Sequence, residues 1–523
     1  MLVLLSVAVG RTAGARVATP IQPNIIVVMT DDQPPGMMRA LPAVQRLIGD
    51  RGATFENAFA SYPICCPARA TFLTGQHAHN HGTLGNGPLT GGGYPALIDP
   101  KRNLAAWLQR AGYETAFAGK WLNGLRTPRA APPGWDRWNG LVGAGGESLS
   151  SFYEYDIFQG NGVPPRHYGS ASRDYQTDVL LRDYALPLIA TQVATPEPFF
   201  LWLAVHPPHD GVGRDDHAGR RCTVGQPDDR SGKQSAIPAP RHASRFARSP
   251  IPHPPSFDER DLRDKPKFMR DHPPLSADDR ELIRLNYRCG LAALLAVDEA
   301  VRSIVIALQQ SGQLSSTVLV FTTDHGALGG EHRIKAGKNR PYEEAIRVPL
   351  LVSGPMIPAG VTPSGPVPNT DLAPTLLELA LTGVPPDLAR PFDGVSQVSA
   401  LRSGVSERRR VVLIEGRDKV ARSRHGFKAR SYVGVRTERY AYTEHRRASA
   451  PNAGAAIGLP IGAGRKTDVE LYDLDRDPYE LESRHRDRAY TATRRVLADL
   501  TKRLERCSGA QCVIAAPVPG PQR

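Results

Sequence analysis

Four short apolar runs, each ending in charged or imidazole side chains, constrain the fold of this 523-residue chain most strongly. Such runs, rich in β-branched residues, are typical of buried parallel strands. They cover residues 24–29, 112–120, 198–205 and 316–323. They end, in the same order, at Asp31 and Asp32, at Lys120, at His206 and His209, and at Asp324 and His325. Parallel strands end at one edge of a sheet, so we expect these side chains to converge there.

Helical patterns separate the runs, most clearly at residues 104–110 and 280–310. This alternation predicts an α/β fold in which helices sandwich a large, doubly wound mixed sheet. Residues 211–274 are rich in Pro, Arg, Asp and His and have little periodicity. We expect them to form an irregular insertion over the edge where the strands end.

Residues 64–75 contain two adjacent cysteines followed by Pro-x-Arg and by a helical pattern that Gly75 closes. Proline at a first helical position has a preset φ and lacks only an N–H that would be unpaired anyway. Cys65 is therefore expected just outside a helix N-terminus, where free N–H groups favour negative charge. Arg69 adds a cation that can hold an oxyanion. A low-pKa thiol or a structural cysteine is the alternative interpretation of Cys65.

This stretch, Cys65-Cys-Pro-Ala-Arg69 followed by Ala70-Thr-Phe-Leu-Thr-Gly75, resembles the sulfatase signature. The resemblance covers about residues 23–482 and implies an alkaline-phosphatase-like fold with a smaller C-terminal α+β subdomain. It also implies that a formylglycine-generating enzyme oxidises Cys65 to formylglycine, whereas Cys66 stays a thiol. Ala68 replaces the commoner serine.

The resemblance places one divalent cation, generally calcium, at the edge of the sheet. Its ligands would be Asp31, Asp32, Asp324, His325 and the modified Cys65. Carboxylate oxygens suit a hard cation. The family most often has asparagine where His325 stands, and imidazole is a softer ligand, so the identity of the metal stays open. A zinc site would contain more histidine or cysteine.

The resemblance further implies covalent catalysis with electrostatic stabilisation of oxyanions. The catalytic residues would be Cys65, Arg69, Lys120, His209 and Lys338. Of these, Lys120, His209 and Lys338 would also contact the substrate, together with Asn123. His209 is preferred to His206 for proton delivery, because Pro-His matches the family's Ala-Pro-His. Residues 119–123 look like the N-acetylglucosamine-6-sulfatase branch.

We expect a catalytic domain over residues 21–395, a smaller subdomain over residues 396–505 and a tail over residues 506–523. Residues 1–20 contain an apolar run and the small residues Ala13, Gly14 and Ala15, which together resemble a signal peptide without its positive n-region. The run is too short to span a membrane. A secreted, periplasmic or extracellular protein is therefore expected.

The net charge of +13 is spread along the chain, without a Lys/Arg block that contains aromatic residues. It favours anionic substrates rather than nucleic acid. Beyond the signature, four cysteines allow three pairings. A Cys507–Cys512 bridge would close a short loop and leave Cys222 with Cys289, and free thiols are the alternative.

These patterns predict a sulfatase that hydrolyses aryl or sugar O-sulfates, for example N-acetylglucosamine 6-sulfate. A phosphonate or phosphate ester hydrolase on the same scaffold is the first alternative. An inactive, secreted carbohydrate-binding homologue is the second. The complete set of acids, lysines and signature residues conflicts with that second alternative.

Overall fold

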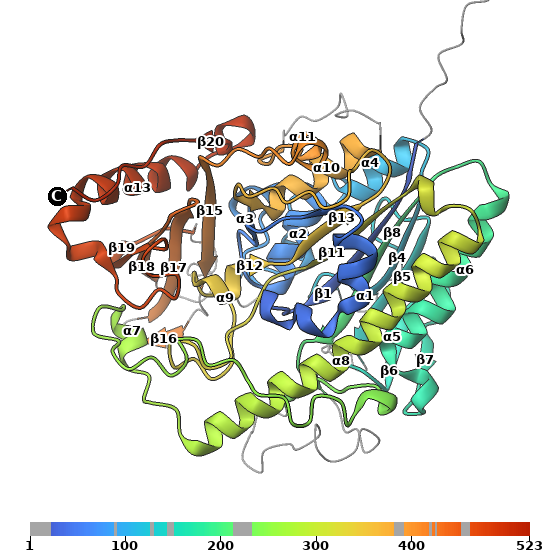
Figure 1. Ribbon diagram of the computed structural model, residues 1–523, viewed down its shortest axis with the longest axis horizontal. Coiled ribbons are helices and arrows are strands. Elements are labelled where there is room, and N and C mark those ends of the chain that lie inside the picture. The colour runs from blue at the N-terminus through green and yellow to red at the C-terminus, as the bar shows by residue number, and fades with distance from the viewer. Residues whose placement is uncertain are drawn as a thin grey trace, which may run out of the picture.

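The computed structural model describes residues 22–87, 91–125, 130–143, 151–212, 233–380, 392–417, 421–423, 426–450 and 461–522. A large sheet with helices on both faces lies beside a smaller C-terminal sheet (Figure 1). The expected signal-like segment, residues 1–20, lies outside the described residues. Within the described residues, no helix is long and apolar enough to cross a membrane.

In the described part of the chain, nine strands form the large sheet in the order β2-β13-β11-β1-β8-β4-β5-β6-β7. Their bounds are Ala53–Thr54, Leu350–Ser353, Thr317–Thr323, Asn24–Asp31, Phe199–Pro208, Glu114–Lys120, Arg137–Gly143, Tyr155–Phe158 and Arg166–Tyr168. The central strands β11, β1, β8, β4 and β5 run parallel. The outer strands are antiparallel. The predicted doubly wound mixed sheet is confirmed.

Strand β1 is buried on both faces because its apolar side chains alternate between two cores. Ile25 and Val27 belong to the core that contains residues of α2 (Cys65–Thr74), α4 (Leu104–Arg110) and α10 (Leu372–Leu379). Ile26 and Val28 belong to the core that contains residues of α8 (Ala277–Gln310). Figure 1 shows α5 (Gln176–Val179) and α6 (Leu186–Thr191) close to α8.

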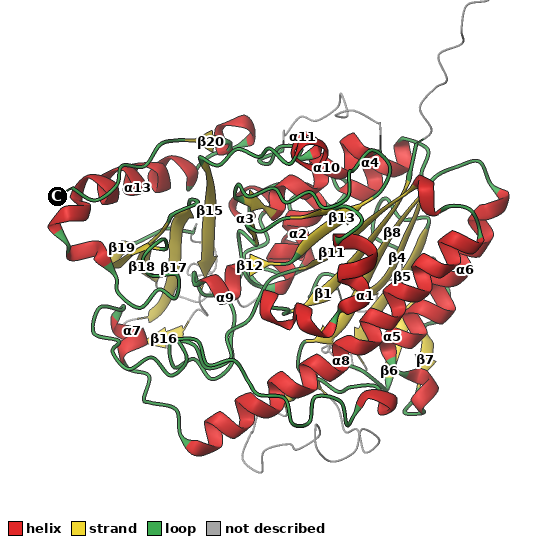
Figure 2. Ribbon diagram, in the orientation of Figure 1, coloured by secondary structure: helices red, strands yellow, loops and turns green. Residues whose placement is uncertain are grey.

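The remaining elements are short. The helices are α1 (Pro42–Val44), α3 (Ala78–His81), α7 (Lys267–Arg270), α9 (Glu343–Ile346) and α11 (Val398–Ser403). The strands are β3 (Ala58–Phe59), β12 (Arg347–Val348), β14 (Val367–Pro368), β9 (Gly211–Val212) and β10 (Lys233–Gln234). In the described part of the insertion predicted at residues 211–274, loops and turns predominate (Figure 2).

Helix α2 begins earlier than the sequence predicts. Ile64 is its extended N-cap residue, so Cys65 is the first helical residue and Pro67 the third. The sequence places Pro67 first in the helix, so the helix begins two residues earlier than expected, and the expectation that Cys65 lies outside it is wrong. The first N–H groups of a helix have no partner within it, so Pro67 is tolerated there too. Gly75 closes the helix with a φ of 64°, as predicted.

The smaller sheet is antiparallel, in the order β19-β18-β17-β15-β20, with β16 paired to β17. Its strands are β15 (Arg410–Arg417), β16 (Ala421–Ser423), β17 (Gly426–Arg436), β18 (Tyr440–Ala450), β19 (Arg465–Asp473) and β20 (Ile514–Ala515). Helix α13 (Thr491–Leu504) packs Leu497 and Leu500 against Val433 and Val435 of one face. Because β20 pairs with β15, the predicted tail contributes a strand to this sheet.

The cysteines follow the predicted pattern as far as they are described. Cys507 and Cys512 form a disulfide, and Cys65 and Cys66 are free thiols. Cys289 is disulfide-bonded. Cys222 lies outside the described residues, so the pairing of these two stays a prediction.

His79 of α3 joins the two parts of the chain. Its Nδ1 lies 2.9 Å from Glu415 Oε2 of β15, and its Nε2 lies 3.0 Å from the Cys507 carbonyl oxygen. Burial disfavours the charged ring, but the Glu415 carboxylate outweighs burial and raises the pKa of His79 to about 9. The folded-state pKa thus lies above the ordinary value of about 6.5.

This pair predicts a loss of stability in alkali. The stabilisation from His79 is complete below about pH 6.5 and is lost as the pH rises through about 9. We expect the free energy of unfolding to fall by about 3 kcal/mol over this window. Urea unfolding at several pH values measures the fall. His79→Gln should remove it, and an equal fall in that variant would contradict the assignment.

Candidate active site

The carboxyl ends of the central strands bring the predicted side chains together. Asp31 is the last residue of β1, and Lys120 is the last residue of β4. Asp324 directly follows β11, and His209 directly follows β8. Since β11, β1, β8 and β4 are neighbours in the sheet, all four side chains lie at one edge.

The Cys65 sulfur lies at the centre of this group. Its Sγ is 3.4 Å from Lys338 Nζ, 3.7 Å from Lys120 Nζ and 3.6 Å from Asp31 Oδ1. Burial opposes ionisation of the thiol, but Lys120 and Lys338 outweigh burial and hold the pKa of Cys65 well below its usual value. Negative charge that develops at position 65 is therefore stabilised by two ammonium groups.

Arg69 fixes the acids of the site. One helical turn after Cys65, its Nε donates to Asp324 Oδ2 at 2.9 Å. Its Nη1 donates to the Lys120 carbonyl oxygen at 2.7 Å, and its Nη2 lies 3.4 Å from Asp31 Oδ2. The side chain is fully buried. In the structure Arg69 thus ties together the ends of β1, β4 and β11.

Asp32, His209 and Lys338 form the solvent side of the site. Their side chains are 15%, 12% and 21% exposed. Asp32 has a left-handed φ of 62°, a conformation that aspartate adopts more readily than most residues. Lys338 Nζ donates to both carboxylate oxygens of Asp32 at 2.7 Å and lies 2.9 Å from His209 Nε2.

Burial disfavours charge on His209, but Asp32 outweighs burial and raises the pKa of His209 to about 10. Its Nδ1 also lies 2.7 Å from the carbonyl oxygen of Asp210. A protonated His209 and Lys338 form a cationic pair beside Cys65. Two cations this close together favour an anionic ligand beside them.

The acidic side of the site fits a divalent cation. His325 donates from Nδ1 to the Gly326 carbonyl oxygen at 2.8 Å, which leaves the lone pair of Nε2 free for a ligand bond. This Nε2 lies 3.3 Å from Asp32 Oδ1 and 3.7 Å from Asp324 Oδ1. Within the described residues, His325 Nε2 is buried without a hydrogen-bond partner, and Asp31 Oδ2 is buried and forms ion pairs with Lys120 and Arg69 but accepts no hydrogen bond. A cation among these atoms would satisfy them, and three carboxylates suit a hard ion.

His206, Cys66 and Asn123 lie near the residues around Cys65 but make different contacts. His206 is fully buried behind His209, with ring centroids 4.8 Å apart, and lies 3.0 Å from the Asp210 carbonyl oxygen. The Cys66 thiol lies 3.8 Å from the Asn123 carbonyl oxygen, and burial raises the pKa of Cys66. No hydrogen bond within the described residues joins the side chain of Asn123 to the other candidate residues. The sequence prediction did not include Asp210, whose carboxylate oxygen Oδ1 lies 2.6 Å from His209 Nδ1. Its position directly after His209 is the feature that could have identified it.

Residues 23–383 match the family model described as Sulfatase. This chain belongs to the sulfatase family. It is 32% identical over 367 residues to the Extracellular sulfatase SULF-1 homolog of Drosophila melanogaster, covering 70% of this chain and 30% of that protein. It is 30% identical over 381 residues to human N-acetylglucosamine-6-sulfatase, covering 71% and 62%. This sulfatase thus spans less than two thirds of the length of these relatives.

Solved structures confirm the alkaline-phosphatase-like fold. BT4656, in complex with its substrate D-glucosamine-2-N,6-O-disulfate, has a TM-score of 0.67 and 23% identity, covering 92% of this chain and 97% of that chain. The phosphonate monoester hydrolase of Agrobacterium radiobacter has a TM-score of 0.60 and 20% identity, covering 91% and 94%. At these identities the likeness concerns the fold alone.

Proposed function

We propose that this sulfatase hydrolyses sugar or aryl sulfate esters through a formylglycine made from Cys65 by a formylglycine-generating enzyme. The position of Cys65 Sγ, between two lysines and beside Asp31, is the observation that carries the proposal. Its resemblance to human N-acetylglucosamine-6-sulfatase supports a sugar 6-sulfate as substrate. Its resemblance to extracellular sulfatases supports secretion.

In this proposal each residue of the site has a separate role. Lys120 and Lys338 hold the sulfate oxygens next to position 65, and Arg69 keeps Asp31 and Asp324 in place. His209 delivers a proton to the leaving oxygen. Asp31, Asp32, Asp324 and His325, with position 65, would hold calcium. The hydrate of the formylglycine aldehyde would supply the nucleophilic hydroxyl, and a bound cation would stabilise negative charge on the sulfate.

Sulfate release from N-acetylglucosamine 6-sulfate and from nitrocatechol sulfate tests the activity. The protein is produced together with a formylglycine-generating enzyme, and ion chromatography measures the free sulfate. Release from at least one ester supports the proposal. No release from either ester, by protein with an aldehyde at position 65 and bound metal, would refute it.

His209→Ala separates proton delivery from sulfate binding. A sugar alkoxide is a poor leaving group, whereas a nitrophenoxide leaves without a proton. We therefore expect a loss of about 10²–10⁴-fold in kcat/KM for the sugar sulfate and a much smaller loss for nitrophenyl sulfate. Steady-state kinetics on both esters measure the two losses. Equal losses would show that His209 only contacts the sulfate.

A further inference from the structure

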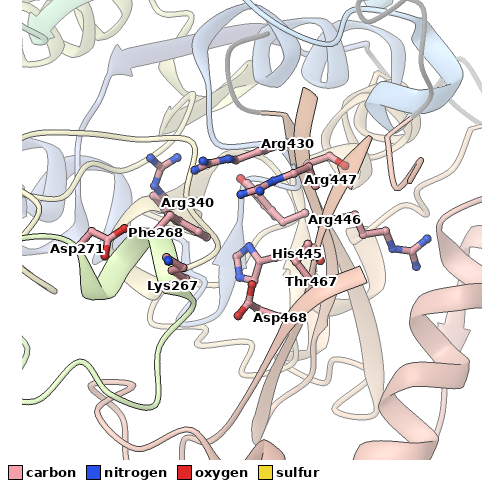
Figure 3. Close-up of a pocket in the computed structure, with 12 residues that line it drawn as sticks. Lys267, Phe268, Asp271, Arg340, Arg430, His445, Arg446, Arg447, Thr467 and Asp468 are labelled. Atoms are coloured by element: carbon pink, nitrogen blue, oxygen red, sulfur yellow. Dashed lines mark hydrogen bonds between the residues drawn. The ribbon is translucent and has the colours of Figure 1, made fainter. Parts of the chain in front are cut away.

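A second pocket lies between α7 and the C-terminal sheet (Figure 3). Five of the residues that line it are cationic. Arg446 pairs with Glu444 and Glu505, whereas the other four cations are Lys267, Arg340, Arg430 and Arg447. Two carboxylates, Asp271 and Asp468, also line it, so the cations are in excess. The pocket lies on the face that presents Tyr432, whereas α13 covers the face that presents Val433.

The strand pairing places several of these cationic side chains opposite one another, which destabilises the sheet. Arg430 of β17 and Arg447 of β18 are direct cross-strand partners, and Arg447 also faces Arg465 of β19. Like charges directly opposite each other destabilise a sheet. Within the described residues, the side chains of Arg430, Arg447 and Lys267 form no hydrogen bond or ion pair. An anionic ligand would relieve this repulsion.

Neighbouring side chains hold the guanidinium groups in position. The guanidinium carbons of Arg340 and Arg430 lie 5.8 Å from the centroid of the Phe268 ring. His445 packs edge-on against Phe268 at 5.3 Å and is fixed by Glu470, 2.6 Å from its Nε2. An apolar ring beside preoriented cations suits a sugar unit that carries an anionic group.

The pocket adjoins the candidate active site. Arg340 follows Lys338 by two residues, which separates their Cα atoms by at most about 7 Å. Tyr432 donates from its hydroxyl to Asn339 Oδ1 at 3.2 Å. The Asn339 N–H donates to the carbonyl oxygen of Pro63, two residues before Cys65, at 2.7 Å. One loop therefore carries Lys338 to the first site and Arg340 to the pocket.

We propose that this pocket binds a sulfate or carboxylate on a second sugar unit of the oligosaccharide whose ester is cleaved at position 65. The proposal rests on the proposed sulfatase function. It narrows the substrate class to polyanionic oligosaccharides, which carry an anionic group outside the ester that reacts.

Direct binding tests the pocket without catalysis. Fluorescence anisotropy measures the affinity of Cys65→Ala protein for a labelled, size-defined heparin tetrasaccharide and for its desulfated counterpart. In this background, Arg430→Gln with Arg447→Gln should raise the Kd for the sulfated probe by about tenfold or more, because two charge-assisted contacts are lost. Lys502→Gln with Arg503→Gln removes the same charge from α13, where both side chains are exposed, and should change the Kd less than about twofold.

Kinetics on converted protein link the pocket to turnover. For the tetrasaccharide, Arg430→Gln with Arg447→Gln should lower kcat/KM about tenfold, mainly through KM, whereas nitrocatechol sulfate should be affected much less. Equal effects of the two double variants on binding, or no effect of either, would contradict the proposal that this pocket binds the anionic group. A lack of hydrolysis of all esters would refute the sulfatase function, and the binding result would still decide whether the pocket holds the anion.

Discussion

Replacement of Cys65 by alanine is expected to lower kcat/KM for sulfate esters by about 10⁴-fold or more, because it removes the nucleophile itself. The substitution takes away one buried sulfur atom and leaves Lys120, Lys338 and Asp31 in place. Sulfate binding should therefore weaken far less than turnover. Steady-state kinetics and mass spectrometry of the peptide that contains position 65 measure the effect.

Cys66→Ala is the matched control. Cys66 belongs to the hydrophobic core, and its thiol lies 3.8 Å from the Asn123 carbonyl oxygen. The variant keeps Cys65, Pro67 and Arg69, so an aldehyde should still form at position 65. Activity within a few-fold of the parent is expected. Full activity in Cys65→Ala, or an aldehyde at position 66, would contradict the assignment.

The second large effect concerns Asp324. Asp324→Asn keeps the shape of the side chain but removes the negative charge that pairs with Arg69 and would bind the proposed cation. We expect about one equivalent of calcium per chain to be lost and kcat/KM to fall by about 10³-fold. Elemental analysis and kinetics measure the two losses.

Asp371→Asn is a suitable control for Asp324→Asn. Asp371 is equally buried and pairs with Arg410 at 3.1 Å, at the N-cap of α10. This variant should lower the melting temperature but retain the metal. Parental metal content and turnover in Asp324→Asn would show that Asp324 has only a structural role.

The sequence predicts the position of those site residues that lie at the ends of strands. Asp31, Lys120, His209 and Asp324 each stand at the end of a parallel strand, so the topology of the sheet alone brings them together. The position of Cys65 depends on the helix predicted beside it, although that helix begins at Cys65 itself, two residues earlier than expected.

Loop conformations could not be predicted in this way. The left-handed turn at Asp32 directs its carboxylate to Lys338, and neither residue lies in a periodic pattern. The contacts of Arg69 with Asp31 and Asp324 depend on tertiary packing, not on spacing in the sequence. The second pocket likewise depends on strand register, which places Arg430 opposite Arg447.

The relative rates on sulfate and phosphonate monoesters of the same phenol test the central claim most directly. They require protein with a confirmed aldehyde at position 65 and bound metal, assayed with nitrophenyl sulfate and nitrophenyl phenylphosphonate under identical conditions. The proposed sulfatase function predicts a kcat/KM at least about tenfold higher for the sulfate. A higher kcat/KM for the phosphonate would contradict it and identify a phosphonate ester hydrolase on the same scaffold.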